Sequence, residues 1–192
     1  MLFRRAWPLA LVLLGCRAPL PPPAPPAELE PEVIELPTAS TPLVACTPTG
    51  VELCFNAIDD NCNGVIDEGC GVHTGLVQIA LAWEKGPDVD LNVTDPTGDK
   101  ALPGHKSQGG LRKDRDCGNP KDGCHGQNLE NVYFDGDAPP KGRYEIEIHL
   151  RRASPDQLPV RVQLGLRIGA RTHALELVLS HPGETQKLAF TL

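Results

Sequence analysis

Apolar and polar residues alternate over most of the chain after residue 71, which predicts a series of β-strands. The alternation covers segments 77–83, 89–93, 130–134, 144–150, 160–168, 175–179 and 188–192. Successive side chains of a strand point to opposite faces, so each segment would bury one face. Turn-forming sequences such as Asp95-Pro96-Thr97-Gly98 separate the segments, and none of them shows a helical period. We therefore expect residues 72–192 to form an all-β domain, an antiparallel β-sandwich of about seven or eight strands.

The first apolar run, residues 6–14, has the properties of a signal peptide. It follows Arg4 and Arg5 and is too short to cross a bilayer as a stable helix. It ends in Leu13-Leu14-Gly15-Cys16, which resembles the bacterial lipobox. The resemblance implies that residues 1–15 are removed and that Cys16 is acylated, which anchors the protein to a membrane through lipid. Arg17 follows the cysteine instead of aspartate, and by the same resemblance this favours the outer membrane.

Residues 16–43 are rich in proline and contain no glycine. Proline fixes φ and lacks an N–H donor, so this segment is predicted to be an extended, disordered stalk of polyproline II type. Its expected role is to hold the folded part away from the lipid surface. The alternative is a proline motif that a partner protein recognises.

Charge is distributed unevenly in this chain, whose formal net charge is -7. No lysine or arginine lies between Arg17 and Lys85, although this stretch contains many acidic residues. Such carboxylates repel one another unless water or a cation screens them. Nucleic-acid binding is not expected, because contacts to phosphate need lysine and arginine.

If Cys16 carries lipid, six of the seven cysteines remain, and in an exported protein these are expected to form disulfides. Two of them, Cys117 and Cys124, are close in sequence and far from the others, which predicts that they pair. The remaining four permit three connectivities, and their sequence positions do not choose between them. A zinc site is the alternative, although zinc cysteines are usually spaced more closely. These four are Cys46, Cys54, Cys62 and Cys70.

The module formed by residues 44–71 contains the first half of a calcium-binding loop. Side-chain oxygens occupy positions 1, 3 and 5, a glycine occupies position 6, and position 7 offers a backbone carbonyl. Position 12 is Cys70 instead of glutamate, so an acidic residue at 67 or 68 must complete the shell. Oxygen ligands favour Ca²⁺ over softer metals. The alternative is a solvated turn rich in Asp and Asn. The expected ligands are Asp59, Asn61, Asn63, Val65, Asp67 and Glu68.

The segment ELCFNAIDDNCNGVIDEGC in this module resembles the Cys/Asp-rich repeat of bacterial surface proteins known as the MopE-type metal-binding motif. The motif departs from the family at Phe55-Asn56-Ala57, where Cys-Asn-Gly is usual. The family name suggests copper, but oxygen ligands and oxidised thiols do not suit Cu(I).

Three segments of the sandwich, AWEKGPDVDLNVTDPTG, QGGLRKDRDCG and LENVYFDGDAPPKGRYEIEI, resemble the uncharacterised bacterial YfaP-like domain family. The resemblance implies a fold more than an activity. If strand pairing gathers the acidic residues of these segments, they would form a second calcium site. The alternative is a solvated polar face. The candidates are Asp88, Asp90, Asp114, Asp116 and Glu130.

No catalytic motif is present, and we expect no enzymatic activity. A zinc or hydrolase site could still be assembled in space from scattered residues such as His105 and His125. The expected function is that of an outer-membrane lipoprotein, on either face of that membrane, with a structural calcium module and a sandwich for binding or envelope assembly. Its partner would be a protein or a glycan. The alternatives are copper or zinc acquisition, which would require free thiols, and a hydrolase with an unrecognised site.

Overall fold

The computed structural model describes residues 29, 31, 33–37, 40–43, 46–48, 50–84, 86–118, 124 and 126–192. The expected signal peptide and the acylation site Cys16 lie outside these residues, as does His125. The described chain contains one 3₁₀ turn, Pro155–Gln157, and no α-helix. Its strands are β1 (Val33–Glu35), β2 (Thr41–Leu43), β3 (Val77–Trp83), β4 (Asp88–Thr94), β5 (Leu111–Asp116), β6 (Leu129–Phe134), β7 (Arg143–Arg152), β8 (Val160–Ile168), β9 (Arg171–Leu179) and β10 (Thr185–Thr191).

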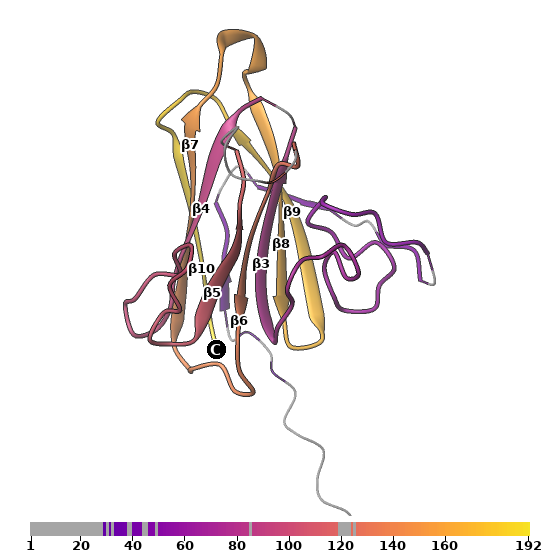
Figure 1. Ribbon diagram of the computed structural model, residues 1–192, viewed down its shortest axis with the longest axis vertical. Helices are drawn as coiled ribbons and strands as arrows, with labels where there is room; N and C mark the ends of the chain where they lie inside the picture. The colour runs from indigo at the N-terminus through magenta and orange to yellow at the C-terminus, as the bar shows by residue number, and fades with distance from the viewer. Residues whose placement is uncertain are drawn as a thin grey trace, which may run out of the picture.

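The strands form two antiparallel sheets that pack face to face (Figure 1). One sheet has the order β1-β10-β7-β4 and the other has the order β2-β9-β8-β3-β6-β5. The all-β sandwich predicted from the sequence is confirmed, with ten strands described in place of seven or eight. The prediction missed β5, whose sequence LRKDRD has only one apolar residue, and the two short strands β1 and β2.

The core consists of the inward-facing residues of both sheets, as the alternation predicts. Ile79 and Leu81 of β3 are fully buried, and so is Ile148 of β7. The rings of Tyr144 and Phe190 stack between β7 and β10 with their centroids 4.7 Å apart. Each buried apolar side chain of this size contributes roughly 1.5–3 kcal/mol to folding, so the alternating pattern supplies most of the driving force.

The N-terminal strands differ from the predicted stalk, which was expected to extend to residue 43. β1 pairs with β10 of one sheet, and β2 pairs with β9 of the other. Both therefore cover the same open side of the sandwich. Pro42 lies within β2 opposite Leu175. This position suits proline because an edge strand needs only half of its hydrogen-bonding groups. The expectation of disorder is therefore wrong for these two segments.

A buried ion pair closes the opposite side of the sandwich, where β4 is an edge strand. Lys113 Nζ of β5 lies 2.7 Å from Glu130 Oε2 of β6, and their side chains are 5% and 1% exposed. The Leu91 N–H of β4 donates to Glu130 Oε2 (2.5 Å), and Lys113 Nζ donates to the Leu91 carbonyl (3.1 Å). Burial opposes charge on Lys113, but the carboxylates of Glu130 and Asp116 raise its pKa above the usual value. The charged pair thus satisfies the N–H and carbonyl groups of Leu91, which a neighbouring strand would otherwise bind.

Removing one member of this pair should be strongly destabilising. Lys113→Met leaves Glu130 as a buried carboxylate without its cation, and we expect a loss of about 3–5 kcal/mol in the free energy of unfolding. The double variant Lys113→Met/Glu130→Gln should lose less, since no unpaired charge remains. Urea denaturation measures both. The control Lys106→Met breaks the exposed contact to Asp135 and should cost at most about 1 kcal/mol. Equal losses for both lysine variants would contradict this role.

Candidate functional site

Two interleaved disulfides hold the front module, which we define as residues 46–72. Cys46 pairs with Cys62 and Cys54 pairs with Cys70, and each bond joins residues 16 positions apart. The structure thus selects one of the three connectivities that the sequence left open. The predicted third bond, Cys117–Cys124, is confirmed. All six of these sulfurs are oxidised, so none is available as a thiolate ligand.

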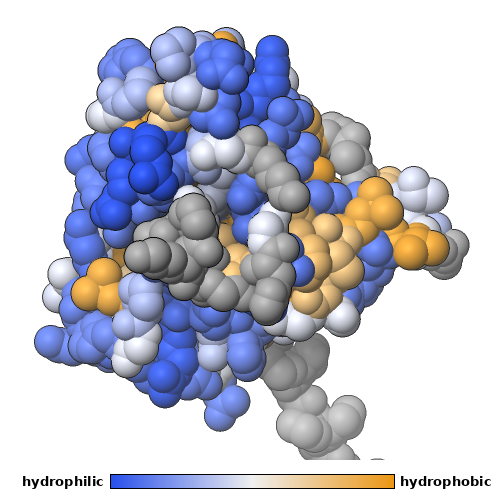
Figure 2. All heavy atoms as spheres, turned by 45° about the horizontal axis from the view of Figure 1, so that its top comes forward, coloured by the Kyte–Doolittle hydropathy of each residue, from blue (hydrophilic) through white to orange (hydrophobic). Residues whose placement is uncertain are grey.

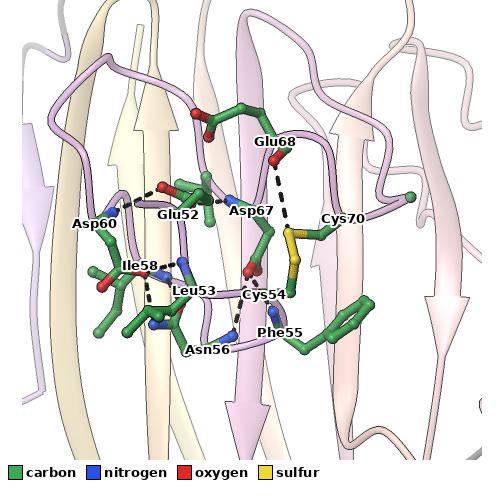
Figure 3. Close-up of a disulfide and its surroundings, with 12 residues drawn as sticks. Glu52, Leu53, Cys54, Phe55, Asn56, Ile58, Asp60, Asp67, Glu68 and Cys70 are labelled. Atoms are coloured by element: carbon green, nitrogen blue, oxygen red, sulfur yellow. Dashed lines mark hydrogen bonds between the residues drawn. A yellow bond between two sulfur atoms is a disulfide. The ribbon is translucent and has the colours of Figure 1, made fainter. Parts of the chain in front are cut away.

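Asp67 is buried inside the module and organises its backbone. Its Oδ1 accepts hydrogen bonds from the N–H groups of Phe55 (2.5 Å) and Asn56 (3.3 Å), and its Oδ2 accepts one from the Ala57 N–H (3.1 Å) (Figure 3). Phe55, Ala57 and Asp67 all have positive φ angles, which non-glycine residues adopt only where the surroundings hold them. Asp67 was expected to be a calcium ligand. Both of its oxygens instead bind backbone within the module.

Glu52 is a second organising carboxylate, and the sequence analysis did not single it out. Its Oε1 accepts from the Asp67 N–H (2.9 Å) and its Oε2 accepts from the Asp60 N–H (3.2 Å), which links two turns of the module (Figure 3). Burial raises the pKa of Glu52 to about 7. In the sequence, this role is indicated only by the position of Glu52 in a stretch without lysine or arginine.

The loop that begins at Asp59 folds as the glycine and the Asx positions predict. Asp59 Oδ1 accepts from the Asn63 N–H (3.0 Å), and Oδ2 accepts from the Gly64 N–H (2.9 Å). Asn63 Oδ1 in turn accepts from the Val65 N–H (2.8 Å). Gly64 has a φ of +83°, and a Cβ there would lie 2.7 Å from the Ala170 carbonyl oxygen. Glycine is therefore needed both for the turn and for contact with the β8–β9 hairpin.

Glu68 closes this loop. The side-chain amides of Asn61 and Asn63 both donate to Glu68 Oε1. Glu68 Oε2 is buried and has no hydrogen-bond partner among the described residues. The side chains of four predicted ligands are thus gathered around one turn, namely Asp59, Asn61, Asn63 and Glu68. The side chain of Asp67 points elsewhere.

The oxygen donors of this turn are mostly not carboxylates. Within the described residues, no group of three or more His, Cys, Asp and Glu side chains is placed to hold a metal ion. Of the predicted ligands gathered at this turn, Asp59 and Glu68 are the carboxylates, and the remaining oxygens come from Asn61, Asn63 and the backbone. Carbonyl and amide oxygens are normal ligands for Ca²⁺ but poor ones for copper or zinc. A site built on this turn would therefore be a weakly charged oxygen site.

The module is fixed to the outer face of the six-stranded sheet, beside β3, β8 and β9 (Figure 1). Thr172 Oγ1 of β9 donates to Asp59 Oδ2 (2.9 Å), and Gln78 Nε2 of β3 donates to the Ile66 carbonyl (3.2 Å). Ala57 and Ile66 pack with apolar residues of the sheet, including Leu129. This sheet therefore has apolar contacts on both faces.

The acidic residues proposed as a second calcium site do not form one oxygen cluster. Asp88 pairs with Arg152 (3.3 Å), and Asp90 pairs with Arg151 (3.0 Å). Asp116 and Glu130 both contact Lys113, whose ammonium group takes the central position. Strand pairing was expected to gather these carboxylates, but β4 belongs to one sheet and β5 and β6 to the other, and cationic side chains lie beside the carboxylates.

Asp114, the remaining candidate, binds His73 instead of other carboxylates. Its Oδ2 lies 2.8 Å from His73 Nδ1 and accepts from the His73 N–H (2.9 Å), while Oδ1 accepts from Asn131 Nδ2 (2.7 Å). The His73 ring stacks on Tyr133 with a centroid separation of 5.2 Å. These contacts fasten His73, the residue that follows the front module, to β5 and β6.

Comparison with known proteins found no matching family model, no matching curated protein and no matching solved structure. The resemblances to the MopE-type motif and to the YfaP-like family thus remain expectations. The described part of the chain contains no helix that is long and apolar enough to cross a membrane.

The front module should lose stability as the pH rises through neutrality. Glu52 has a pKa of about 7 in the folded state against an ordinary value of 4.5, so the folded state binds its proton more tightly. That contribution is present at low pH and is lost as the pH rises through 7. In the presence of a chelator, the free energy of unfolding should fall from about pH 5 to about pH 8.

Glu52→Gln tests this expectation, because the amide does not titrate. The variant should show a smaller decrease over this pH range, even though the lost acceptor lowers its stability at every pH. Glu84→Gln makes the same change at an exposed position and should retain the full decrease. If the slope for Glu52→Gln equals that of the unaltered chain, another group is responsible.

Proposed function

We propose that this chain is a surface lipoprotein of the outer membrane. Its front module holds a structural Ca²⁺ ion, and its sandwich binds a protein or glycan partner. The observation that carries the calcium assignment is the buried Glu68 Oε2, which lacks a partner within the described residues and lies beside the Asp59 turn. A carboxylate oxygen removed from water and left without a donor is strongly unfavourable unless a cation meets it.

The chemistry of the donors favours calcium over other metals. Asp59, Asn61, Asn63 and Glu68 supply carboxylate and amide oxygens, and Val65 would supply its carbonyl. When bound, the ion would neutralise charge in a module that lacks lysine and arginine. The paired cysteines count against copper or zinc acquisition, since thiophilic metals need free thiolates.

The disulfides also support a location outside the cytosol, where such bonds persist. They agree with the signal sequence and the lipobox at Cys16. A small module with few apolar residues depends on such cross-links, because it cannot bury enough surface on its own.

The front module also offers a contact surface for a protein partner. Val51 and Leu53 are 82% and 60% exposed on this module. Figure 2 shows apolar side chains on the projecting side of an otherwise mainly hydrophilic surface. The ion would fix the shape of the module and so the position of these side chains.

Calcium should raise the melting temperature of the exported protein. Binding to the folded state alone adds about 2.7 kcal/mol at a calcium concentration one hundred times Kd. Differential scanning calorimetry with millimolar calcium and with a chelator measures the shift. Copper and zinc should give no comparable increase.

Matched variants locate the effect. Glu68→Gln should weaken calcium binding at least tenfold, whereas Asp137→Asn removes one exposed charge outside the module and should leave it unchanged. A melting temperature indifferent to calcium in the unaltered protein would refute the calcium assignment.

Lipid anchoring is tested by the intact mass of the exported protein. The expected mass is that of residues 16–192 with acyl chains on Cys16 and three disulfides, and titration should detect no free thiol. Cys16→Ser should abolish acylation, and the protein should then be released from the membrane fraction. An unacylated Cys16 in the membrane fraction would contradict the proposal.

A further inference from the structure

A groove of about 310 Å³ lies where the front module meets the six-stranded sheet. The module contributes Phe55, and the end of β3 together with β8 and β9 contributes most of the remainder. The volume is at the lower end of the range for small-molecule sites, about 300–1,000 Å³. The lining residues outside the module include Ala82, Glu84, Arg161, Gln163 and Glu176.

Strand register brings the polar lining of the groove together on the outer face of the sheet. Gln163 of β8 is paired with Ala82 of β3 on one side and with Glu176 of β9 on the other. All three alternate with buried core residues, so they point away from the core. Arg161 lies two positions before Gln163 on the same face, and its Nη1 is 2.7 Å from Glu176 Oε1. Donors and acceptors of three side chains are therefore neighbours along the groove.

These polar groups are accessible and have hydrogen-bonding capacity to spare. The side chains of Arg161 and Glu176 are 65% and 28% exposed. Their hydrogen bond joins Nη1 to Oε1 and leaves Arg161 Nη2 and Glu176 Oε2 without a partner among the described residues. Gln163 is partly exposed, and its amide makes no hydrogen bond within the same part of the chain. The groove can thus donate and accept at adjacent points.

The module side of the groove presents an aromatic ring on a fixed backbone. Phe55 is partly exposed, and its ring points away from the Asp67 carboxylate that accepts from its N–H group (2.5 Å) (Figure 3). The adjacent Cys54 is bonded to Cys70, which further restricts this backbone. Phe55 also packs against apolar residues of the sheet. A ring held in this way loses little conformational entropy when a ligand packs on it.

We propose that this groove binds a neutral saccharide, with a sugar ring on Phe55 and its hydroxyl groups on the polar side chains of β8 and β9. The C–H face of a pyranose is apolar and its rim carries hydroxyls, which suits an aromatic ring beside mixed donors and acceptors. The groove contains two carboxylates, Glu84 and Glu176, and one guanidinium, which disfavours an anionic sugar. This inference rests on the binding role proposed for the sandwich and names a glycan as its partner.

NMR titration of the exported mature protein provides the test, with maltotriose, cellotriose, mannotriose and triacetylchitotriose as neutral probes. At least one of them should give saturable shifts for the Ala82 methyl group and the Gln163 side-chain amide. The methyl group of Ala189, which lies on β10 in the other sheet, should not respond. The anionic trigalacturonate should not bind. Absence of saturable shifts with all four neutral sugars overturns the proposal, as does trigalacturonate binding as tightly as any of them.

Two variants locate the sugar in the groove. Phe55→Leu keeps an apolar side chain without the ring, and Gln163→Leu keeps the size of the side chain without the amide. Each should weaken binding about three- to tenfold, which corresponds to one ring contact or one hydrogen bond. Gln186→Leu, the same change on β10 outside the groove, should leave the affinity unchanged. If Phe55→Leu does not fold, Gln163→Leu decides, and an unchanged affinity in that variant overturns the proposal.

The titration is run once with calcium and once with a chelator, on a sample whose acylation and calcium-dependent melting are also measured. Saturable binding under either condition supports the saccharide site. If calcium raises the melting temperature and Cys16 is acylated but no sugar binds, only the saccharide site is refuted. If a sugar binds and calcium has no effect on melting, the calcium assignment is refuted and the saccharide site stands.

Discussion

The buried carboxylate of Asp67 is the interaction on which the front module depends. It gathers three N–H groups from the segment that follows Cys54 and fixes two residues with positive φ angles there. Donors and acceptor lie more than nine residues apart, so this one side chain sets the path of the backbone between the two disulfides. With Asp67 turned inward, Glu68 is turned toward the Asp59 loop, and the candidate calcium ligands lie together.

The two sides of the sandwich are closed by different chemistry. On one side, Lys113 and Glu130 bind the peptide groups of Leu91 through charged side chains. On the other side, β1 and β2 add backbone pairing to one sheet each. Both solutions satisfy polar groups at a sheet edge, which would otherwise be free to pair with another chain.

The sequence predicted the parts of this structure that follow from local periodicity. The strand alternation from Val77 to Leu192 and the turn around Gly64 depend on neighbouring residues only, and both are observed. The Cys117–Cys124 bond was predictable for the same reason.

Partners that are distant in the chain could not be predicted in this way. The role of Lys113 depends on strand pairing that brings Glu130 beside it, and its charge replaces the oxygen cluster that the acidic residues suggested. Asp67 and Glu68 are adjacent and chemically similar, yet one faces the module interior and the other faces the loop. The strands β1 and β2 are short, and the proline content of their segment concealed them.

The pairing of β1 and β2 also determines where the folded unit begins. A fragment starting at residue 44, the boundary that proline content suggests, would lack both strands and would leave β10 and β9 as bare edges. Two unprotected edges on the same side of one molecule are templates for association between copies. The last part of the proline-rich segment, which contains β1 and β2, thus also shields the domain from association between copies.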